Sequence, residues 1–459
     1  MNRIEFDVEL ITKYDVNGPR YTSYPTANEF VNEFSAGHYI DALDRLDGAE
    51  TAPISMYIHV PFCANICYYC ACNKIVTANR KHADAYLEHL LCEINLQSEL
   101  LTNNHRLEQL HFGGGTPTYF SDKQFSSVFA ALHEHFNLAT SSERDFSIEI
   151  DPRTVDAERI RLLSSLGFNR MSFGIQDFDP QVQRAVNRLQ SEDETACVIN
   201  AARANGIESV SVDLIYGLPL QTVAGFEQTL ARVLRLGPDR ISLYNYAHLP
   251  QRFKTQRQIK AADLPDPATK LELLRTAIEV FDQAGMVYIG MDHFAKPTDT
   301  LVRAQQDGTL HRNFQGYTTH GHCDLIGLGV SAISSVSGVY SQNAKDLDGY
   351  YRHIDQHRLP IERGIVLTVD DLITRELISA LMCHFKLDIA AFEARHGFKF
   401  REYFESEWEA LIPFQREGLL RLSDTLIEVT AKGRFVIRNI CMTFDTYLAP
   451  HQSGFSRAI

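Results

Sequence analysis

The sequence predicts an α/β fold built on a parallel sheet, followed by a smaller, mainly helical domain. Two observations lead to this prediction. From residue 55 to about 295, apolar strand-like runs alternate with longer amphipathic stretches, and from residue 368 helix-like runs take over. The alternation does not distinguish a doubly wound sheet from a full or partial barrel. In all of these folds the chemistry lies at the carboxyl ends of the strands.

Six runs of apolar residues are predicted to be strands. They are SMYIHV (55–60), LEQLHF (107–112), DFSIEI (145–150), RMSFGI (170–175), SVSVDLIY (209–216) and RISLYNYA (240–247). Strands that are apolar along most of their length are typical of a parallel sheet covered by helices. In the stretch 85–101, Leu87, Leu90, Leu91 and Ile94 recur at helical spacing, so a helix is expected between the first two strands.

Capping residues mark the expected ends of the helices. Ser121 and Thr154 stand where N-caps belong. Gly167, Gly206 and Gly237 follow the ends of periodic segments, as C-caps do.

The alternation of strands and helices stops near residue 296. The segment 311–335 is rich in Gly, His and Thr, which favours loops and short strands. After residue 368, helix-like runs precede the hairpin-like LLRLSDTLIEVTAKG, an order typical of a winged helix, which often binds DNA. Residues 368–459 hold 11 Lys and Arg against 13 Asp and Glu. This balance favours a lid or packing domain over a DNA-binding domain.

Composition and charge argue against several classes of function. The net charge of −14 is opposite to that of a general nucleic-acid binder. The chain contains no run of about 18 or more apolar residues, so no membrane span is expected. The start, MNRIEFDVELITKYD, is too acidic for a signal or transit peptide. The sequence therefore predicts a cytoplasmic protein.

Four of the nine cysteines fall within the stretch CANICYYCAC (63–72). A structural zinc site usually takes two pairs of ligands a dozen or more residues apart, and no second CxxC or paired HxxxH follows here. Disulfides are not expected in a reducing compartment. Tightly spaced thiolates suit an iron–sulfur cluster better. The other cysteines, Cys92, Cys197, Cys323, Cys383 and Cys441, are expected to be buried as small apolar residues.

The spacing of the four clustered cysteines predicts two different roles. Cys63, Cys67 and Cys70 can wrap three corners of a [4Fe-4S] cluster from one short loop. Cys72 lies only two residues past Cys70 and would reach a fourth corner in a strained way. Three ligands would leave one iron open, and an open metal position is a place for chemistry. We expect Cys72 to be a non-ligand that either acts near the site or simply packs there.

The CxxxCxxC spacing after the first strand resembles the signature of the radical S-adenosylmethionine (SAM) superfamily. Other motifs follow in order: GPRYTSYPTA (18–27), YIHVPFCANICYYCACNK (57–74), GGGTPT (113–118), IEIDPR (148–153), FGIQDF (173–178), VDLIYGLP (212–219) and NFQGYTT (313–319). Together they resemble the oxygen-independent coproporphyrinogen III oxidases, from about residue 18 to beyond 440. CxxxCxxC alone is typical of the superfamily, whereas Cys72, YTSYP and QGYTT make the narrower resemblance specific.

The resemblance implies a fold and a division of the chain. The fold is a partial (β/α)6 barrel of the radical SAM type with a smaller, mainly helical C-terminal domain. The parts are an amino-terminal arm (1–50), the partial barrel (51–296), a barrel extension with substrate-site loops (297–367) and a winged-helix-like lid domain (368–459). The resemblance also implies a [4Fe-4S] cluster and two SAM molecules per chain.

Candidate SAM-binding residues lie near the strand ends. Gly113 to Gly115 follow the second strand, where missing side chains let a ligand approach the backbone, although a plain strand-to-helix turn is the alternative. Glu149 and Asp213, taken singly, could equally be capping or ion-pair residues. The resemblance assigns Tyr57, Gly114, Glu149, Ala247 and Ile333 to the SAM at the cluster. It assigns Tyr69, Gly115, Thr116, Gln176, Arg188 and Asp213 to the second SAM.

The activity that the resemblance implies is the oxidation of coproporphyrinogen III, a step of haem biosynthesis. A 5′-deoxyadenosyl radical from SAM would abstract a β-hydrogen from a propionate, and loss of one electron and carbon dioxide would leave a vinyl group. Two such events give protoporphyrinogen IX. Arg20, with Tyr21 and Tyr24, could meet the propionates, although an anchored arm explains these residues equally well. A flavodoxin-type reductase is expected as electron donor, and the oxidoreductase is expected to be a monomer.

Two other functions remain as alternatives. One is a haem-binding chaperone related to these oxidases but without oxidase activity. That group lacks the YTSYP arm and the fourth cysteine, and it carries an HNxxYW-like segment where this chain has HRNFQGYTT. The single tryptophan here, Trp408, lies far from that segment in sequence. The other alternative is a structural zinc or redox-sensor protein, which metal analysis would identify.

Overall fold

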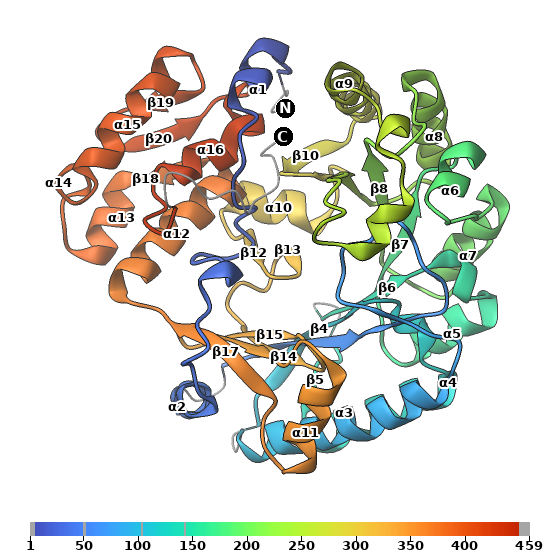
Figure 1. The fold of residues 1–459 in the computed structure, drawn as a ribbon. Helices are drawn as coiled ribbons and strands as arrows, with labels where there is room; N and C mark the ends of the chain where they lie inside the picture. The colour runs from blue at the N-terminus through green and yellow to red at the C-terminus, as the bar shows by residue number, and fades with distance from the viewer. Residues whose placement is uncertain (1–4, 49–51, 102–103, 142–143, 449–459) are drawn as a thin grey trace. The chain divides into compact units, whose positions relative to one another are not determined.

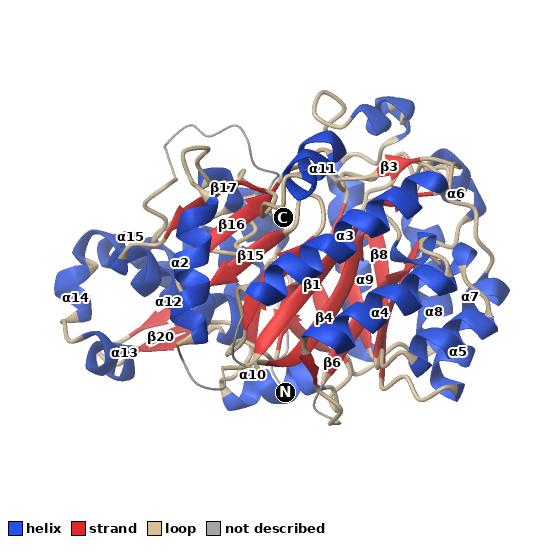
Figure 2. Ribbon diagram, turned by 90° about the horizontal axis from the view of Figure 1, so that it is seen from below, coloured by secondary structure: helices blue, strands red, loops and turns tan. Residues whose placement is uncertain are grey.

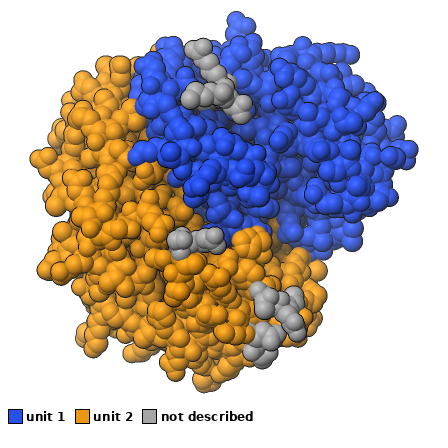
Figure 3. Space-filling view, turned by 180° about the vertical axis from the view of Figure 1, so that it is seen from behind, with its two compact units in different colours: residues 1–29, 274–321, 367–459 blue, residues 30–273, 322–366 orange. Residues whose placement is uncertain are grey.

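The computed structural model describes residues 5–48, 52–101, 104–141 and 144–448. It forms two compact units, coloured separately in Figure 3. Residues 30–273 and 322–366, unit 2 in Figure 3, are here called the sheet unit. Residues 1–29, 274–321 and 367–459, unit 1 in Figure 3, are here called the terminal unit. The boundary predicted between residues 50 and 51 lies outside the described residues.

All six predicted strands are present in the sheet unit (Figure 1). They are β1 (Ile54–Val60), β4 (Arg106–Gly114), β6 (Asp145–Ile150), β7 (Arg170–Gln176), β8 (Ser209–Tyr216) and β9 (Arg240–Asn245). The predicted bounds of β6 and β8 agree with the structure. The prediction for β9 was too long, because the strand ends at Asn245 and Ala247 follows it.

The order of the strands decides between the fold classes that the sequence left open. The six strands pair in parallel in the order β9-β8-β7-β6-β4-β1, which is their order along the chain. A doubly wound sheet would reverse this order at a switch point. The second neighbour of β1 is β14 (Asp324–Leu328), so the described residues form an open barrel. The predicted partial barrel is confirmed.

Beyond β14 the sheet changes direction. The antiparallel strands β15 (Ile333–Val336), β16 (Val339–Asn343) and β17 (Ile361–Val366) continue it. The short β5 (Asn137–Leu138) pairs with β4. Ten strands of one continuous path, with β5 beside them, therefore make up the sheet of this unit.

Helices cover one face of this sheet, and Figure 2 shows α3 and α4 along the strands β1, β4 and β6. The helices of the unit are α2 (Ala36–Asp47), α3 (Lys81–Glu99), α4 (Asp122–His135), α5 (Ala157–Ser165), α6 (Pro180–Ala185), α7 (Glu192–Ala204), α8 (Val223–Leu236) and α11 (Leu347–Asp355). The helix predicted over 85–101 begins four residues earlier than expected, as α3. Cys92 on α3 and Cys197 on α7 are exposed rather than buried as predicted, because they lie on the solvent sides of these helices.

Most of the predicted caps are confirmed. Ser121 caps α4, since its side chain accepts a hydrogen bond from Gln124 N. Gly237 caps α8 in the left-handed region, with φ of 63°. The prediction for Thr154 was wrong: it ends a short 3-10 turn, and the carboxylate of Asp156 caps α5 instead.

The two faces of the sheet differ in polarity. Alternate residues of each strand are buried aliphatic or aromatic side chains, such as Met56, Ile58 and Phe112. The intervening residues are polar and lie side by side by register, as do Tyr57 and His111, Glu149 and Ser172, and Asp213 and Ser242. Because successive strand residues point to opposite faces, one face packs against helices and the other carries polar side chains.

The terminal unit contains the predicted helical domain. Its elements are α1 (Val8–Tyr14), β10 (Val287–Gly290), β11 (His293–Ala295), α10 (Thr300–Asp307), β12 (His311–Asn313), β13 (Gly316–Thr318), α12 (Val369–His384), β18 (Lys386–Asp388), α13 (Ile389–His396), α14 (Phe400–Tyr403), α15 (Glu405–Arg416), β19 (Leu420–Leu422), β20 (Leu426–Val429) and α16 (Ile437–Met442). The predicted hairpin is β19 and β20. Helix α9 (Pro267–Gln283) crosses the boundary between the units in sequence.

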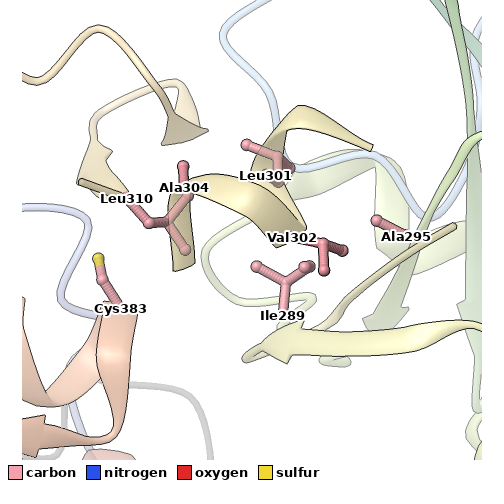
Figure 4. Packing of buried hydrophobic residues seen from close by; sticks show 7 residues of the cluster. All are labelled: Ile289, Ala295, Leu301, Val302, Ala304, Leu310 and Cys383. Atoms are coloured by element: carbon pink, nitrogen blue, oxygen red, sulfur yellow. The ribbon is translucent and has the colours of Figure 1, made fainter. Parts of the chain in front are cut away.

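A compact apolar cluster lies within the terminal unit. It gathers residues of β10, β11, α10 and α12, as Figure 4 shows. Its buried members are Ile289, Ala295, Leu301, Val302, Ala304, Leu310 and Cys383. This packing joins residues 287–310 to the helical domain in one core. Among the described residues, no helix is long and apolar enough to cross a bilayer.

The segment YTSYP is anchored to the C-terminal end of the same unit. Tyr21 donates a hydrogen bond to Asp445 at 2.9 Å, and the hydroxyl groups of Tyr24 and Thr446 lie 3.0 Å apart. Both tyrosines are buried. Tyr21 and Tyr24 therefore have a structural role as anchors, which was one of the two explanations that the sequence left open.

Candidate active site

The cysteine loop begins at the carboxyl end of β1, and a short pairing closes it. β2 (Phe62–Cys63) pairs in parallel with β3 (Ile75–Val76). Ile75 N donates to Pro61 O at 2.7 Å, and Thr77 N donates to Cys63 O at 3.0 Å. The two ends of the loop are thus held together by backbone hydrogen bonds.

Side chains from outside the loop hold its backbone. Asn187 Nδ2 donates to Ile66 O at 2.7 Å, and Gln256 Nε2 donates to Tyr69 O at 3.0 Å. Each contact satisfies a carbonyl that lacks a partner in regular secondary structure. The position of Tyr69 in the loop is therefore fixed through its backbone.

The four cysteines of the loop are free thiols that differ in exposure: Cys63 and Cys67 are buried, Cys70 is half-buried and Cys72 is exposed. Thr116 Oγ1 donates to Cys63 Sγ at 3.4 Å. Arg188 and Arg153 donate to Cys67 Sγ at 3.5 and 3.7 Å. The hydrogen bond from Thr116 lowers the pKa of Cys63, but burial outweighs it and raises this pKa to about 11. The thiolate is the form that binds metal, so metal binding at Cys63 would release its proton.

Cys70 and Cys72 form a closely coupled pair of thiols. A hydrogen bond from Cys72 lowers the pKa of Cys70 to about 6, against the effect of burial and with help from Lys74. The same hydrogen bond raises the pKa of Cys72 well above its usual value, and the charge of Glu149 adds to the rise. Cys70 is thus the thiolate of the pair, and Cys72 lies within electrostatic reach of Glu149.

Three successive glycines at the end of β4 lie beside the cysteine loop. A Cβ on Gly114, whose φ is +121°, would lie 2.8 Å from the His59 ring. A Cβ on Gly115 would lie 2.7 Å from Pro61 O. Gly115 N and Thr116 N donate to the carbonyls of Val60 and Phe62. The glycines are therefore required where β4 passes closely along the strand that leads to Cys63.

Glu149 lies near the carboxyl end of β6 and faces the same glycines. Gly114 N donates to Glu149 Oε2 at 3.2 Å, and His111 Nε2 lies 3.5 Å from Glu149 Oε1. The Tyr57 ring stacks on His111 with centroids 5.8 Å apart. The Glu149 side chain remains 46% exposed, so it can accept hydrogen bonds from a ligand.

Asp213 lies on β8, on the same polar face. It accepts a hydrogen bond from Ser172 Oγ at 3.2 Å. Burial and the charge of Glu149 raise the pKa of Asp213 to about 6, although its hydrogen bonds partly offset this. Asp213 is therefore a carboxyl group that titrates about one pH unit below neutrality, as expected of a group that binds hydroxyls.

Arg188 lies between the cysteine loop and the strand β7. Its Nη1 contacts Asp151 Oδ2 at 3.1 Å as well as the sulfur of Cys67, and its Nη2 donates to Gly174 O at 2.7 Å. A Cβ on Gly174 would lie 2.8 Å from Gln176 Nε2 and 2.9 Å from Arg188 Nη2. Gln176 and Arg188 therefore come together over Gly174. Contacts within the protein already use both Nη groups of the Arg188 guanidinium.

Tyr57 and Ile333 lie close together through Gly327. Tyr57 pairs with Gly327 in the β1–β14 register, and a Cβ on Gly327 would lie 2.5 Å from Ile333 O. The Ile333 backbone thus lies against the strand next to Tyr57. Ala247 lies in the loop after β9, two residues beyond the strand that was predicted to end there.

These residues fit the group that the sequence predicts. Cys63, Cys67 and Cys70 offer three thiols on one closed loop, with N–H and O–H donors directed at two of the sulfurs. Beside them the glycines of β4 leave out side chains, and Glu149 offers an exposed carboxylate. A [4Fe-4S] cluster ligated by the three sulfurs, with the positively charged SAM beside it, matches this set of donors and acceptors.

Two histidines of the site were not identified from the sequence. Tyr57 OH and His59 Nδ1 are 3.0 Å apart, and His59 Nε2 lies 3.0 Å from Asn73 O. Burial lowers the pKa of His59, so the ring is neutral and bridges β1 to the end of the cysteine loop. His111 supports Glu149. The signal was present, because Tyr57, His59 and His111 alternate with apolar residues on their strands.

Arg20 lies in the terminal unit, where it contacts Asp292 in an ion pair. Two further arginines of this unit were missed in the sequence. Arg438 is buried and donates to Pro19 O at 2.7 Å. Cζ of Arg312 lies 4.7 Å from the centre of the Tyr317 ring, and its Nε and Nη1 are buried with no hydrogen-bond partner among the described residues.

Comparison with known proteins gives separate matches for the open barrel and for the C-terminal helical domain. A model of the radical SAM superfamily matches residues 57–233, and one of the HemN C-terminal domain matches residues 367–436. The oxygen-independent coproporphyrinogen III oxidase of Pseudomonas aeruginosa is 49% identical over 462 residues, covering 100% of both chains. That of Escherichia coli is 47% identical over 461 residues, again covering 100% of both.

A solved structure shows the same fold. Coproporphyrinogen III oxidase (HemN) from Escherichia coli, described as a radical SAM enzyme, superposes with a TM-score of 0.93 at 46% identity, covering 97% of this chain and 100% of that one. The likeness thus covers the open barrel, the cysteine loop and the helical domain together. On this whole-length similarity, the chain belongs to the family of oxygen-independent coproporphyrinogen III oxidases within the radical SAM superfamily.

Proposed function

We propose that the chain oxidatively decarboxylates two propionate side chains of coproporphyrinogen III to vinyl groups, giving protoporphyrinogen IX without oxygen. The observation that carries this proposal is the loop with three gathered thiols beside Glu149 and the bare backbone of β4, in a chain that matches the named oxidases along its whole length. Each event removes one hydrogen atom, one electron and one carbon dioxide from a propionate. The electron passes to an acceptor outside the chain.

Cys63, Cys67 and Cys70 would hold a [4Fe-4S] cluster, and Cys72 would stay a thiol. Bound together, the cluster and SAM would supply radical chemistry at the β-carbon of a propionate. A low-potential donor of the flavodoxin-reductase type would reduce the cluster. Arg188 and Arg153 hold the sulfur of Cys67 by charged hydrogen bonds, which lower the electron density on that ligand.

Glu149 and the glycine backbone would bind the SAM at the cluster. Its amino group needs an acceptor such as the Glu149 carboxylate, while Tyr57, Ala247 and Ile333 would line the adenosine. His111 fixes the Glu149 side chain from the other side at 3.5 Å, and His59 fixes Tyr57 at 3.0 Å. These residues therefore orient the ligand rather than react with it.

The second SAM would lie near Tyr69, Gly115, Thr116, Gln176, Arg188 and Asp213. Asp213 supports this proposal as a carboxyl group able to bind ribose hydroxyls. Arg188 supports it less directly, because its two Nη atoms already contact Asp151 and Gly174. We therefore assign Arg188 a positioning role at Cys67 and Gln176, and Asp213 a direct contact.

Arginines of the terminal unit would bind the propionates of the substrate. Burial and the charge of Arg20 lower the pKa of Arg438 to about 10, and Arg312 adds to this effect. Arg20 and Arg312 thus each lie close enough to Arg438 to repel its charge, and Asp292 is an ion-pair partner of Arg20. A carboxylate from the substrate would relieve this repulsion and satisfy the open nitrogens of Arg312.

An anaerobic turnover experiment tests the proposal. The reconstituted protein is mixed with a reductant, SAM and coproporphyrinogen III, and the tetrapyrrole is analysed by mass spectrometry. We expect the loss of two carboxyl groups and the formation of 5′-deoxyadenosine. The Cys63→Ser variant is the matched control and should yield neither product. Haem binding by a cluster-loaded protein that leaves the tetrapyrrole unchanged would favour the related chaperone instead.

A further inference from the structure

We propose a second metal site in the sheet unit, formed by Glu108, His322 and Cys323. It would bind one divalent ion of intermediate softness, with Zn²⁺ preferred. The site lies at the amino-terminal edge of the sheet, whereas the cysteine loop lies at the carboxyl edge. Glu108 and Gly114 are both on β4, and their separation of six residues corresponds to about 20 Å along a strand. The two sites are therefore distinct.

The three residues come from the two strands that flank β1. Glu108 belongs to β4, and His322 and Cys323 directly precede β14. Ile54, the first residue of β1, is opposite Leu107 on one side and Asp324 on the other. The ligand atoms of all three residues lie within 4.8 Å of one another, and His322 Nε2 is 3.1 Å from Glu108 Oε2. The sheet itself therefore brings the three side chains together.

A β-bulge directs Glu108 toward the other two ligands. The pairing of β1 with β4 moves from Ile54 and Leu107 to Ser55 and Gln109, so that Glu108 is the additional residue. The neighbouring Leu107 and Leu110 are both fully buried, while Glu108 is half-buried. Bulges commonly re-aim one side chain of a strand. Here the bulge places a carboxylate where the regular alternation would not.

The three donors are those of a zinc site. Thiolate sulfur, imidazole nitrogen and carboxylate oxygen all bind Zn²⁺, at distances of about 2.0–2.3 Å. Ligands of one tetrahedral ion are then about 3.5 Å apart, so small side-chain rotations would suffice here. Hard ions such as Mg²⁺ and Ca²⁺ prefer sets of oxygen atoms and do not select a thiolate. Three protein ligands leave the fourth position to water.

An ordinary ion pair does not explain the whole arrangement. The contact between His322 and Glu108 would form without a thiol, yet Cys323 lies beside it at the more protected end of the group. A bound ion would tie β4 to β14 across the start of β1. Because the other end of β1 leads into the cysteine loop, this ion would stabilise the strand that carries the active-site loop.

Zinc binding by the anaerobic holoenzyme tests the site. The [4Fe-4S] cluster must be present, because the loop thiols would otherwise bind zinc themselves. ZnCl2 is titrated in competition with a chromophoric chelator, and native mass spectrometry counts the ions. We expect one zinc per chain, no competition from Mg²⁺, and affinities at least about 100-fold weaker in Cys323→Ser and His322→Asn. Cys92→Ser, which changes an exposed cysteine of α3, should bind zinc like the parent.

Two results would overturn the proposal. One is a holoenzyme that takes up no zinc at concentrations where the chelator is loaded. The other is zinc uptake that both Cys323→Ser and His322→Asn leave unchanged. The His322 side chain is 56% exposed, so His322→Asn should fold even if Cys323→Ser does not. Iron content and SAM cleavage, measured in the same samples, separate this outcome from a failure of the proposed oxidase function.

Discussion

Buried arginines occur in both units, but their charges are balanced differently. In the sheet unit, burial opposes the charge of Arg188, yet Tyr69, Asp151 and Cys67 together outweigh it and raise its pKa. In the terminal unit, burial and the neighbouring Arg20 lower the pKa of Arg438. Arg312 there keeps two buried nitrogens with no hydrogen-bond partner among the described residues.

The difference indicates in which unit the arginines are expected to bind an anionic ligand. In the sheet unit, Asp151 balances the charge of Arg188, so this side chain fixes the sulfur of Cys67 and the backbone of Gly174. In the terminal unit, the charges of Arg20 and Arg312 act on Arg438, and two buried nitrogens of Arg312 have no hydrogen-bond partner among the described residues. Since a buried N–H group without a partner is costly, we expect an anionic ligand that accepts hydrogen bonds from Arg312 to bind there. The four propionates of the proposed substrate are such anions.

The largest effect is expected from replacing the cysteines of the loop in the sheet unit. Replacing Cys63, Cys67 or Cys70 by Ser should abolish a stable cluster, because each supplies one thiolate ligand. Cys72→Ser should retain iron and sulfide while losing part or most of the turnover, since Cys72 lies within reach of Glu149. Iron and acid-labile sulfide analysis checks this, with Cys92→Ser as control. Loss of the cluster in Cys72→Ser would disprove the assignment of three ligands.

The next effect concerns the carboxylate at the cluster. Glu149→Ala should retain iron but weaken SAM binding by about 10-fold to 100-fold, the value of one charged hydrogen bond. Equilibrium binding of SAM to the anaerobic protein measures this. Glu88→Ala, an exposed change on α3, serves as control. An unchanged affinity in Glu149→Ala would leave that residue with a structural role only.

Variants of Arg312 test whether the terminal unit binds the propionates of the substrate. Arg312→Ala should raise KM for coproporphyrinogen III about tenfold while leaving the cluster and SAM binding intact, because one charged hydrogen bond to a propionate is lost. Arg312→Lys should recover part of the loss, since it retains the charge without the planar fork. Steady-state kinetics of these variants and of Arg395→Ala, an exposed control, give the answer. Equal KM values in all of them would contradict propionate binding by Arg312.

The smallest effect is on the pH dependence of stability. The folded chain raises the pKa of Asp213 to about 6, so its protonated form is favoured on folding. This contribution to the free energy of unfolding is complete below about pH 4 and is lost as the pH rises through 6. Asp213→Asn should therefore flatten the profile between pH 4 and 6. Urea unfolding of the cluster-free protein measures it, and Asp44→Asn on α2 should keep the parental slope.

Local sequence signals predicted the elements of the sheet unit closely. The bounds of β6 and β8 followed from their apolar runs, because a strand buried on one face and paired on both sides leaves a strong pattern. Thr154 was misplaced as a cap because the Asp156 carboxylate, two residues later, competes for the same role. The order of the strands could not be predicted from local pattern, since pairing depends on contacts far apart in sequence.

The candidate site was predictable where chemistry is concentrated in one motif. The cysteines and glycines fall in short segments, so they could be named from spacing. Arg312 and Arg438 could not, because 126 positions separate them and a buried guanidinium has no local signature. The same applies to Glu108 and Cys323, which the sheet brings together across β1. Residues that become neighbours only in the folded chain are not marked by any local sequence motif.

The pairing of β2 with β3 bears on how the metal centre is assembled and repaired. These four residues pair through backbone hydrogen bonds, which are bonds in which a metal ion takes no part. The entropy of closing the loop is therefore lost when the sheet unit folds rather than when the cluster enters. When oxygen strips the cluster, the emptied loop should keep its thiols within reach of one another. A new cluster could then be inserted into a loop that is already folded, and the loop would not need to refold.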